Sequence, residues 1–391
     1  MGVGSRDDDA EHSGMAHFLE HLLFKGSTER DARALAEAMD ALGGQFNAYT
    51  TREYTCFHCH TLGQHFAAAM DLLGELVCRP ALCARDVLRE RAVVLDELRL
   101  LADDPQELGS DDFSRALWGD HPFGRPEAGT VQTVSNCTPD AVRSFYASRY
   151  TASAITVAVS GAIDPDEACS IAERTIGAYV TRGGAGVLRE PPLAQSSAVQ
   201  RVRPGEQAYV HFGTASATLQ EERRWATGLL AAILGGSQSS RLFQELREEQ
   251  GLCYDVGAYD LPSTDTGQFG IFLATSPEEV SQAVAYARRI VEEIQTRGVV
   301  PEELQRNQQM AIQQIWMAHE SPEARMSALG RSLALGLPPI PPQVAVRRLA
   351  MVTAEDVAAA CRRLGPPDTW AASAVVPRSM PLGNWVWDGV H

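Results

Sequence analysis

The chain has 391 residues, of which 45% are apolar, and its formal net charge at pH 7 is −16. This length predicts two or three folded domains with an ample apolar core. The acidic balance argues against a nucleic-acid partner, and because no run approaches 18 apolar residues, the sequence also argues against a membrane-spanning helix.

The first expected helix covers about residues 14 to 24 and carries the most informative motif of the chain. His17 and His21 are four residues apart, so on a helix both imidazoles lie on one face and can bind one metal ion. Glu20 lies beside them and can reach a metal-bound water without itself binding the metal. The order H-x-x-E-H is the reverse of the H-E-x-x-H helix of zinc proteases. The simpler alternative is an amphipathic helix whose apolar side chains only pack a core.

A second helix is expected over 31–42, followed by a strand-rich segment over 46–62. Within that segment, Cys56 to His60 reads C-x-x-C-H, the attachment pattern of c-type haem. On a strand, however, Cys56 and Cys59 point to opposite faces, so we expect no haem. The other cysteines show no paired spacing, and the acidic first residues show no signal peptide. Reduced thiols and a cytoplasmic location are therefore expected.

The third metal ligand is expected on a long helix over about 84–102, which follows a helix over 64–77. Catalytic zinc usually takes three protein ligands and one water. Glu90 and Glu97 are seven residues apart, two turns along one helix face. Glu97 can bind the zinc ion, and Glu90 can hydrogen-bond a zinc-bound histidine. Each glutamate alone is more typical of a solvated surface, and only the histidine helix makes the metal interpretation the better one.

The rest of the chain mixes helices and strands in two halves, and the expected first-half elements are helices over 106–118, 139–147 and 165–178 and a strand over 154–160. The expected second-half elements are strands over 208–213, 252–260 and 267–275 and helices over 219–234, 239–249 and 277–297. Glycines and prolines between 181 and 206 predict an interdomain linker. Because strands and helices do not strictly alternate, the sequence predicts an α+β fold with antiparallel sheets. The predicted domains are 1–180 and 207–391.

Several stretches together resemble the pitrilysin family of zinc metallopeptidases. They are GSRD at 4–7, GMAHFLEHLLFKGS at 14–27, GGQFNAYT at 43–50, HPFG at 121–124, SSRLFQELR at 239–247 and GLCY at 251–254. More narrowly, the chain is similar to the two-domain bacterial relatives of the mitochondrial processing peptidase β subunit. In that family the third zinc ligand is a glutamate in a segment similar to the one around Glu97.

The resemblance implies two homologous α/β sandwich domains, each an antiparallel-rich mixed sheet packed with helices. The first would carry zinc and the second would be inactive, since its matching helix, about 225–234, has no His or Glu. Asn47 and Ala48 would lie on an edge strand that pairs with an extended peptide, although they could equally form an ordinary strand start. Arg247 and Tyr254 match a family pair that contacts substrate near the scissile bond; the alternative is a surface arginine and a packed tyrosine.

The sequence therefore predicts a zinc endopeptidase with one Zn²⁺ per chain that cleaves extended peptides in a closed chamber. The resemblance implies a dimer, either with a second copy or with a related chain. The alternative is a non-catalytic partner that binds peptides or supports an active homologue, but silent relatives typically lose a ligand and this chain keeps all three.

Family members usually carry further strands before GSRD. Either the start codon is misplaced or the first sheet lacks an edge hairpin and exposes a sheet edge.

Overall fold

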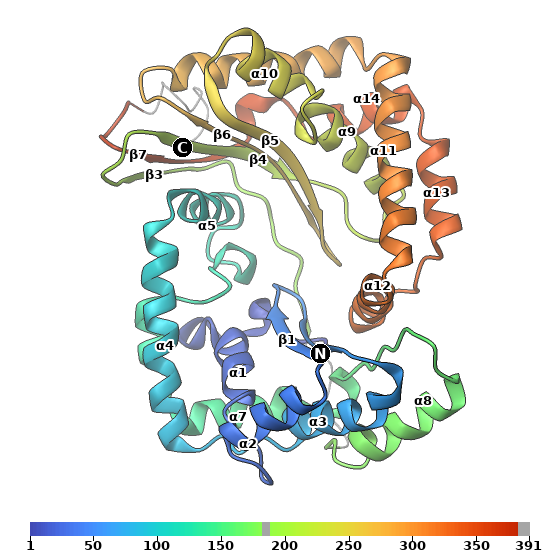
Figure 1. Ribbon diagram of the computed structural model, residues 1–391. Helices are drawn as coiled ribbons and strands as arrows, with labels where there is room; N and C mark the ends of the chain where they lie inside the picture. Colours follow the sequence, from blue (N-terminus) through green and yellow to red (C-terminus); the bar gives the residue numbers. More distant parts are fainter. Residues whose placement is uncertain (182–187, 382–391) are drawn as a thin grey trace. The chain divides into compact units, whose positions relative to one another are not determined.

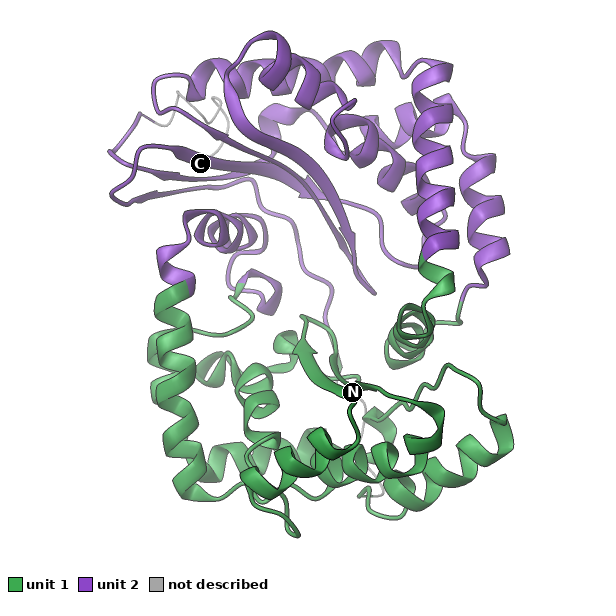
Figure 2. Ribbon diagram, in the orientation of Figure 1, with its two compact units in different colours: residues 1–100, 125–189, 318–339 green, residues 101–124, 190–317, 340–391 purple. Residues whose placement is uncertain are grey.

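A computed structural model describes residues 1–181 and 188–381. The chain forms two compact units, which Figure 2 shows in green and purple. Unit 1 comprises residues 1–100, 125–189 and 318–339, and unit 2 comprises residues 101–124, 190–317 and 340–391. Both contain helices and sheet, so the predicted α+β class is confirmed. No helix in the described part of the chain has the length and apolarity needed to cross a membrane.

Unit 1 is mainly helical. Its α-helices are α1 (Met15–Leu23), α2 (Ala32–Ala41), α3 (Phe66–Cys78), α4 (Ala84–Asp103, whose last turn passes into unit 2), α6 (Val131–Ser135), α7 (Pro139–Arg149), α8 (Pro165–Ala172) and α12 (Pro322–Ala334). One apolar core joins α1 to its neighbours, with the side chains of Phe18, Leu19 and Leu23 fully buried. The apolar face of the motif helix thus packs a core, while its histidines lie on the other face.

The predicted strand segment over 46–62 is a hairpin of two antiparallel strands, β1 (Gln45–Thr50) and β2 (Thr55–His60), because a turn interrupts it. Residues of β1 alternate between exposed and half-buried, as expected for side chains that point to opposite faces of a strand. Phe46 packs against the core that contains α1. The hairpin therefore presents one face of β1 to the motif helix (Figure 1).

The strand expected over 154–160 is wrong. Residues 155–160 form no strand, and no backbone–backbone hydrogen bond of theirs is found among the described residues. The alternation of β-branched residues suits a strand, but a strand also needs a neighbouring strand to pair with. Helix α12 lies against this segment instead, and the Nε of Arg325 donates to the hydroxyl of Ser160 at 3.1 Å.

Unit 2 contains a mixed five-stranded sheet in the order β3-β7-β4-β6-β5, in which only β3 and β7 are parallel. The strands are β3 (Ala198–Val202), β4 (Ala208–Ala215), β5 (Cys253–Pro262), β6 (Gly267–Thr275) and β7 (Ala371–Val376). The helices are α5 (Pro105–Trp118), α9 (Arg224–Gly235), α10 (Val280–Arg297), α11 (Pro301–Glu320, which ends in unit 1), α13 (Pro342–Met351) and α14 (Ala354–Arg363).

Helices cover both faces of this sheet. On one face the side chains of α9, α10 and α14 form the main core with inward residues such as Phe212 and Trp370. On the other face α5 buries Phe113, Leu117 and Trp118. Unit 2 is therefore a layered sandwich whose sheet is apolar on both sides (Figure 1).

Candidate metal centre

The N-terminus of α1 is held by the carboxylate of Asp8, which precedes the helix by a few residues. One carboxylate oxygen of Asp8 accepts a hydrogen bond from the N–H of Gly14 at 2.8 Å, and the other accepts from Ala16 at 3.1 Å. Free N–H groups at a helix start need such acceptors. Gly14 has a φ of +92°, a conformation that other residues rarely adopt. The first turn is thereby held in place before the histidines begin.

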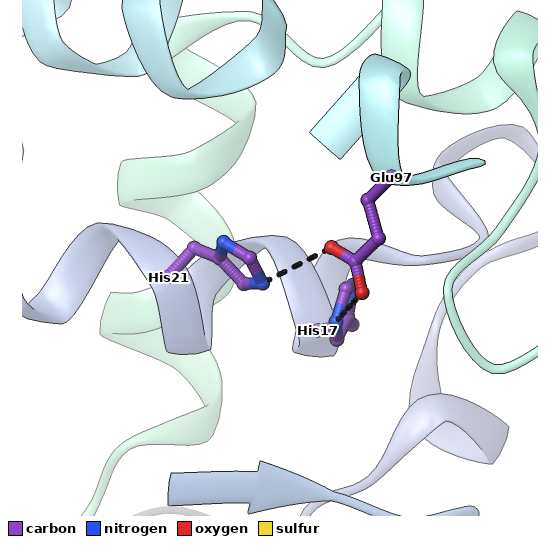
Figure 3. A group of neighbouring side chains, drawn as sticks. All are labelled: His17, His21 and Glu97. Atoms are coloured by element: carbon purple, nitrogen blue, oxygen red, sulfur yellow. Dashed lines mark ion pairs between the residues drawn. The ribbon is translucent and has the colours of Figure 1, made fainter. Parts of the chain in front are cut away.

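His17 and His21 extend from α1 toward Glu97 on α4 (Figure 3). The Nε2 of His17 lies 3.7 Å from one Glu97 oxygen, and the Nε2 of His21 lies 3.5 Å from the other. These separations are too long for good hydrogen bonds. Two ligands bound tetrahedrally to zinc at about 2.1 Å are roughly 3.4 Å apart, so the gap fits a zinc ion. All three ligand atoms lie within 4.8 Å of one another.

Glu90, one of the two glutamates selected from the sequence, is buried behind His21. One of its oxygens lies 3.1 Å from the Nδ1 of His21, and the other lies 2.9 Å from the ammonium of Lys25. Burial raises the pKa of Glu90, but the bonds from His21 and Lys25 outweigh it and hold the pKa below its usual value. An ionised Glu90 keeps the proton of His21 on Nδ1. The lone pair of Nε2 then faces Glu97.

The two histidines differ in their surroundings. The hydrogen bond with Glu90 raises the pKa of His21 against the effect of burial. Burial and the neighbouring His21 lower the pKa of His17, although Glu97 acts in the opposite direction. The Nδ1 of His17 is buried and has no hydrogen-bond partner among the described residues. A neutral imidazole with a free Nε2 is the form that binds zinc, and both histidines can adopt it.

Glu20 directly precedes His21 on α1, and the charges of His21 and Glu97 act on it, but it is not one of the three candidate ligands. Burial raises the pKa of its carboxyl, and a hydrogen bond from the hydroxyl of Thr50 partly offsets that effect. A raised pKa moves a carboxylate toward the range in which it accepts and returns protons near neutral pH. Glu20 is therefore a candidate for proton transfer at this centre.

Asn47 and Ala48 lie in the middle of β1, in register with His58 and Phe57 of β2. In the described part of the chain β1 pairs with β2 alone, so its other edge borders no strand. The side chain of Asn47 accepts from the N–H of Ala48 at 2.9 Å. An unpaired strand edge can accept an extended peptide.

Arg247 and Tyr254 belong to unit 2, whereas the candidate ligands belong to unit 1. Arg247 lies in a π-helical segment (Phe243–Glu249) that ends the helix expected over 239–249, and Tyr254 lies at the start of β5. The guanidinium of Arg247 is 5.6 Å from the centre of the Tyr254 ring, and Tyr254 is 71% exposed. The two side chains form an adjacent, accessible pair.

Three residues of the site were not identified from the sequence: Asp8, Lys25 and Thr50. Lys25 follows His21 by four residues, so helical spacing carried a usable signal for it. Asp8 and Thr50 contact α1 from loop and strand positions eight or more residues away in the sequence. No local pattern encodes such contacts.

Two histidines one turn apart, a distant carboxylate and an adjacent glutamate are the arrangement typical of metal-dependent hydrolases of the H-x-x-E-H type. The comparisons with known proteins agree with that class. A family model described as "Insulinase (Peptidase family M16)" matches residues 1–131, and one described as "Peptidase M16 inactive domain" matches residues 136–311. The chain belongs to the M16 peptidase family, and the resemblance drawn from the sequence is confirmed.

Similar proteins carry names that agree with this family. An uncharacterized zinc protease of Mycobacterium tuberculosis is 37% identical over 369 residues, which is 93% of this chain and 84% of the relative. The uncharacterized zinc protease YmxG of Bacillus subtilis is 32% identical over 337 residues, which is 86% of this chain and 82% of the relative.

Two solved structures share the fold. One is described as a peptidase M16 inactive domain from Pseudomonas fluorescens, with a TM-score of 0.87 at 21% identity, covering 100% of this chain and 92% of that one. The other is described as a protease from Helicobacter pylori, with a TM-score of 0.86 at 18% identity, covering 96% of this chain and 92% of that one. At these identities the likeness concerns the fold alone.

Proposed function

We propose that the chain is a zinc-dependent endopeptidase with one Zn²⁺ per chain. His17, His21 and Glu97 are the proposed ligands, and Glu20 is the proposed general base. The observation that carries the proposal is the convergence of these three ligand atoms within 4.8 Å, with Glu20 on the same helix as the two histidines. The names of the relatives as zinc proteases support the same reaction class.

Each residue of the proposed site has its own chemical role. A bound zinc ion lowers the pKa of water and polarises the scissile carbonyl. Glu20 accepts a proton from the attacking water and passes it to the departing amine. Glu90 keeps His21 in the tautomer and orientation that ligation requires, and Lys25 supports Glu90 from its other oxygen.

Substrate binding is assigned to β1 and to a pair in unit 2. An extended peptide pairs with the backbone at Asn47 and Ala48, which demands little of its side chains. Arg247 and Tyr254 contact the substrate near the scissile bond and stabilise the developing oxyanion, as the family resemblance implies. The proposal includes a closed chamber and a dimer, formed with a second copy or with a related chain.

Elemental analysis of the purified protein and a peptide-cleavage assay test this function. The wild type is expected to hold one zinc ion and to cleave unstructured peptides. Glu20→Gln should keep the zinc and lose about 100- to 10,000-fold in kcat, because it loses the base and keeps the shape. Glu107→Gln, an exposed change on α5, is the matched control.

The outcomes separate the two functions drawn from the sequence. Cleavage that persists in Glu20→Gln would remove the proposed base. Stoichiometric zinc without any cleavage, also in the presence of a related chain, would support a non-catalytic partner that binds peptides or supports an active homologue. Absence of zinc would contradict the metal centre itself.

A further inference from the structure

We propose that Thr50 is a positioning residue, which holds the carboxylate of Glu20 in one orientation for proton transfer. This inference rests on the proposed function, since it assigns a role around the same general base. Thr50 is not one of the three candidate ligands, and its hydroxyl bonds Glu20, so its role acts through Glu20.

The hydrogen bond between the two residues is short. The hydroxyl oxygen of Thr50 lies 2.6 Å from one oxygen of Glu20, Oε2. An ionised carboxylate has no proton to give, so the hydroxyl donates. Bonds of this kind, in which one partner is charged, are shorter and stronger than neutral ones. Thr50 therefore engages Oε2, and the proposal assigns Oε1 to the proton of the attacking water.

The position of Thr50 follows from the hairpin. Phe46, Ala48 and Thr50 share one face of β1, and Phe46 on that face packs against the core built around α1. Thr50 is the last residue of the strand and ends opposite Thr55 in the register. The strand thus delivers a hydroxyl to the motif helix at the turn where Glu20 lies.

The surroundings restrain the Thr50 side chain. Its oxygen lies 3.3 Å from the hydroxyl oxygen of Thr55, which is fully buried and can donate to the carbonyl of Val3 at 3.0 Å. In the turn that follows, Thr51 donates to the carbonyl of Tyr54 at 2.9 Å. A β-branched side chain also has few rotamers available. Glu20, by contrast, has three rotatable side-chain bonds, so the threonine fixes the glutamate.

Thr50→Val and Thr50→Ser test the proposal as a pair, because valine keeps the shape without the hydroxyl and serine keeps the hydroxyl. Thr50→Val should retain its zinc and its KM but lose about ten- to a hundredfold in kcat. Thr50→Ser should recover most of that loss. In crystal structures of the zinc-loaded proteins, the Glu20 carboxylate should have one orientation in the wild type and in Thr50→Ser, and several in Thr50→Val.

Thr61→Val is the matched control, since the hydroxyl of Thr61 bonds the backbone of Leu42 just beyond the same hairpin. It should leave kcat unchanged. Thr50→Ala replaces Thr50→Val if the valine variant fails to fold. An unchanged kcat in the variant without the hydroxyl, or an unmoved Glu20, overturns the positioning role. If the wild type cleaves no peptide, the proposed function fails, and the orientation of Glu20 in the crystal structures still decides the role of Thr50.

Discussion

Helix α1 is the motif helix of unit 1, and α9 of unit 2 is the helix that the family resemblance gives as its counterpart. The two helices differ in composition. Helix α1 carries three titratable groups on one face, whereas α9 has no His, Asp or Glu and buries seven of its side chains. Partial burial shifts the pKa of both His17 and Glu20 in the direction that opposes their charged forms. Helix α1 therefore keeps partly buried titratable groups at an energetic cost, which the proposed metal chemistry would explain, while the described side chains of α9 mainly pack the core.

The largest effect is expected from removal of a proposed zinc ligand, because α1 would then bind no metal and would no longer differ from α9 in this respect. Glu97→Ala leaves two imidazoles, and we expect cleavage to fall by at least about a thousandfold, because catalytic zinc needs three protein ligands. Zinc content, measured by elemental analysis after dialysis, should fall in parallel. Retention of stoichiometric zinc by this variant would show that the third ligand has been wrongly assigned.

Chelation should separate the stabilities of the two units. A metal that binds only the folded form stabilises it by about 2.7 kcal/mol when its free concentration is a hundred times Kd. Removal of zinc should therefore raise hydrogen exchange in α1 and α4 and leave exchange in the sheet of unit 2 unchanged. Equal effects on both units would contradict a metal site confined to unit 1.

A smaller effect is expected from the residue behind His21. Glu90→Gln removes the charge that holds the proton of His21 on Nδ1, so zinc affinity should fall about ten- to a hundredfold with cleavage retained at saturating zinc. Competition with a chromophoric chelator measures the affinity. Glu107→Gln again serves as the control, and unchanged affinity in Glu90→Gln would leave Glu90 without a role at the metal.

The smallest expected effect is a pH dependence of the free energy of unfolding, which arises from a carboxyl group in unit 2. Burial raises the pKa of Asp260 from 3.8 to about 6, against opposing interactions with Ser216 and Arg223. The folded state therefore binds the proton more tightly than the unfolded state, and the resulting stability is lost as pH rises through about 6. Between pH 5 and pH 7.5 the wild type should lose on the order of 1 kcal/mol of unfolding free energy that Asp260→Asn does not lose.

Denaturant unfolding at the two pH values measures that difference. His211, whose pKa burial lowers to about 4, has the opposite pH dependence, but it is present in both proteins and cancels. A parallel pH dependence in wild type and Asp260→Asn would show that Asp260 titrates as an exposed carboxyl does.

The sequence predicted the candidate ligands and Glu20 better than it predicted the residues that hold them in place. His17, Glu20 and His21 are readable because a helix places neighbours three and four residues apart on one face, and Glu90 and Glu97 because seven residues make two turns. The expected helices around them also correspond closely to α1, α2, α3 and α4. Helical spacing can be read from the sequence without knowledge of distant contacts, so long helices and the residues that share a helix face are predictable.

Features that depend on a distant partner could not be predicted in this way. Residues 155–160 have the pattern of a strand and no strand to pair with. Asp8 and Thr50 are ordinary loop and strand residues until the fold brings them to α1. Arg247 and Tyr254 were predicted only through the family resemblance, because their adjacency in unit 2 depends on the fold.

The backbone contact between Gly14 and Gly129 has a consequence for mutational tolerance. Both residues have positive φ, and a side-chain carbon on either would collide with the carbonyl oxygen of the facing segment, that of Ala128 or Ser13. Any replacement must push the first turn of α1 aside, and His17 lies only three residues later. In a saturation library these two glycines should accept no substitute without loss of cleavage, even in variants that remain folded.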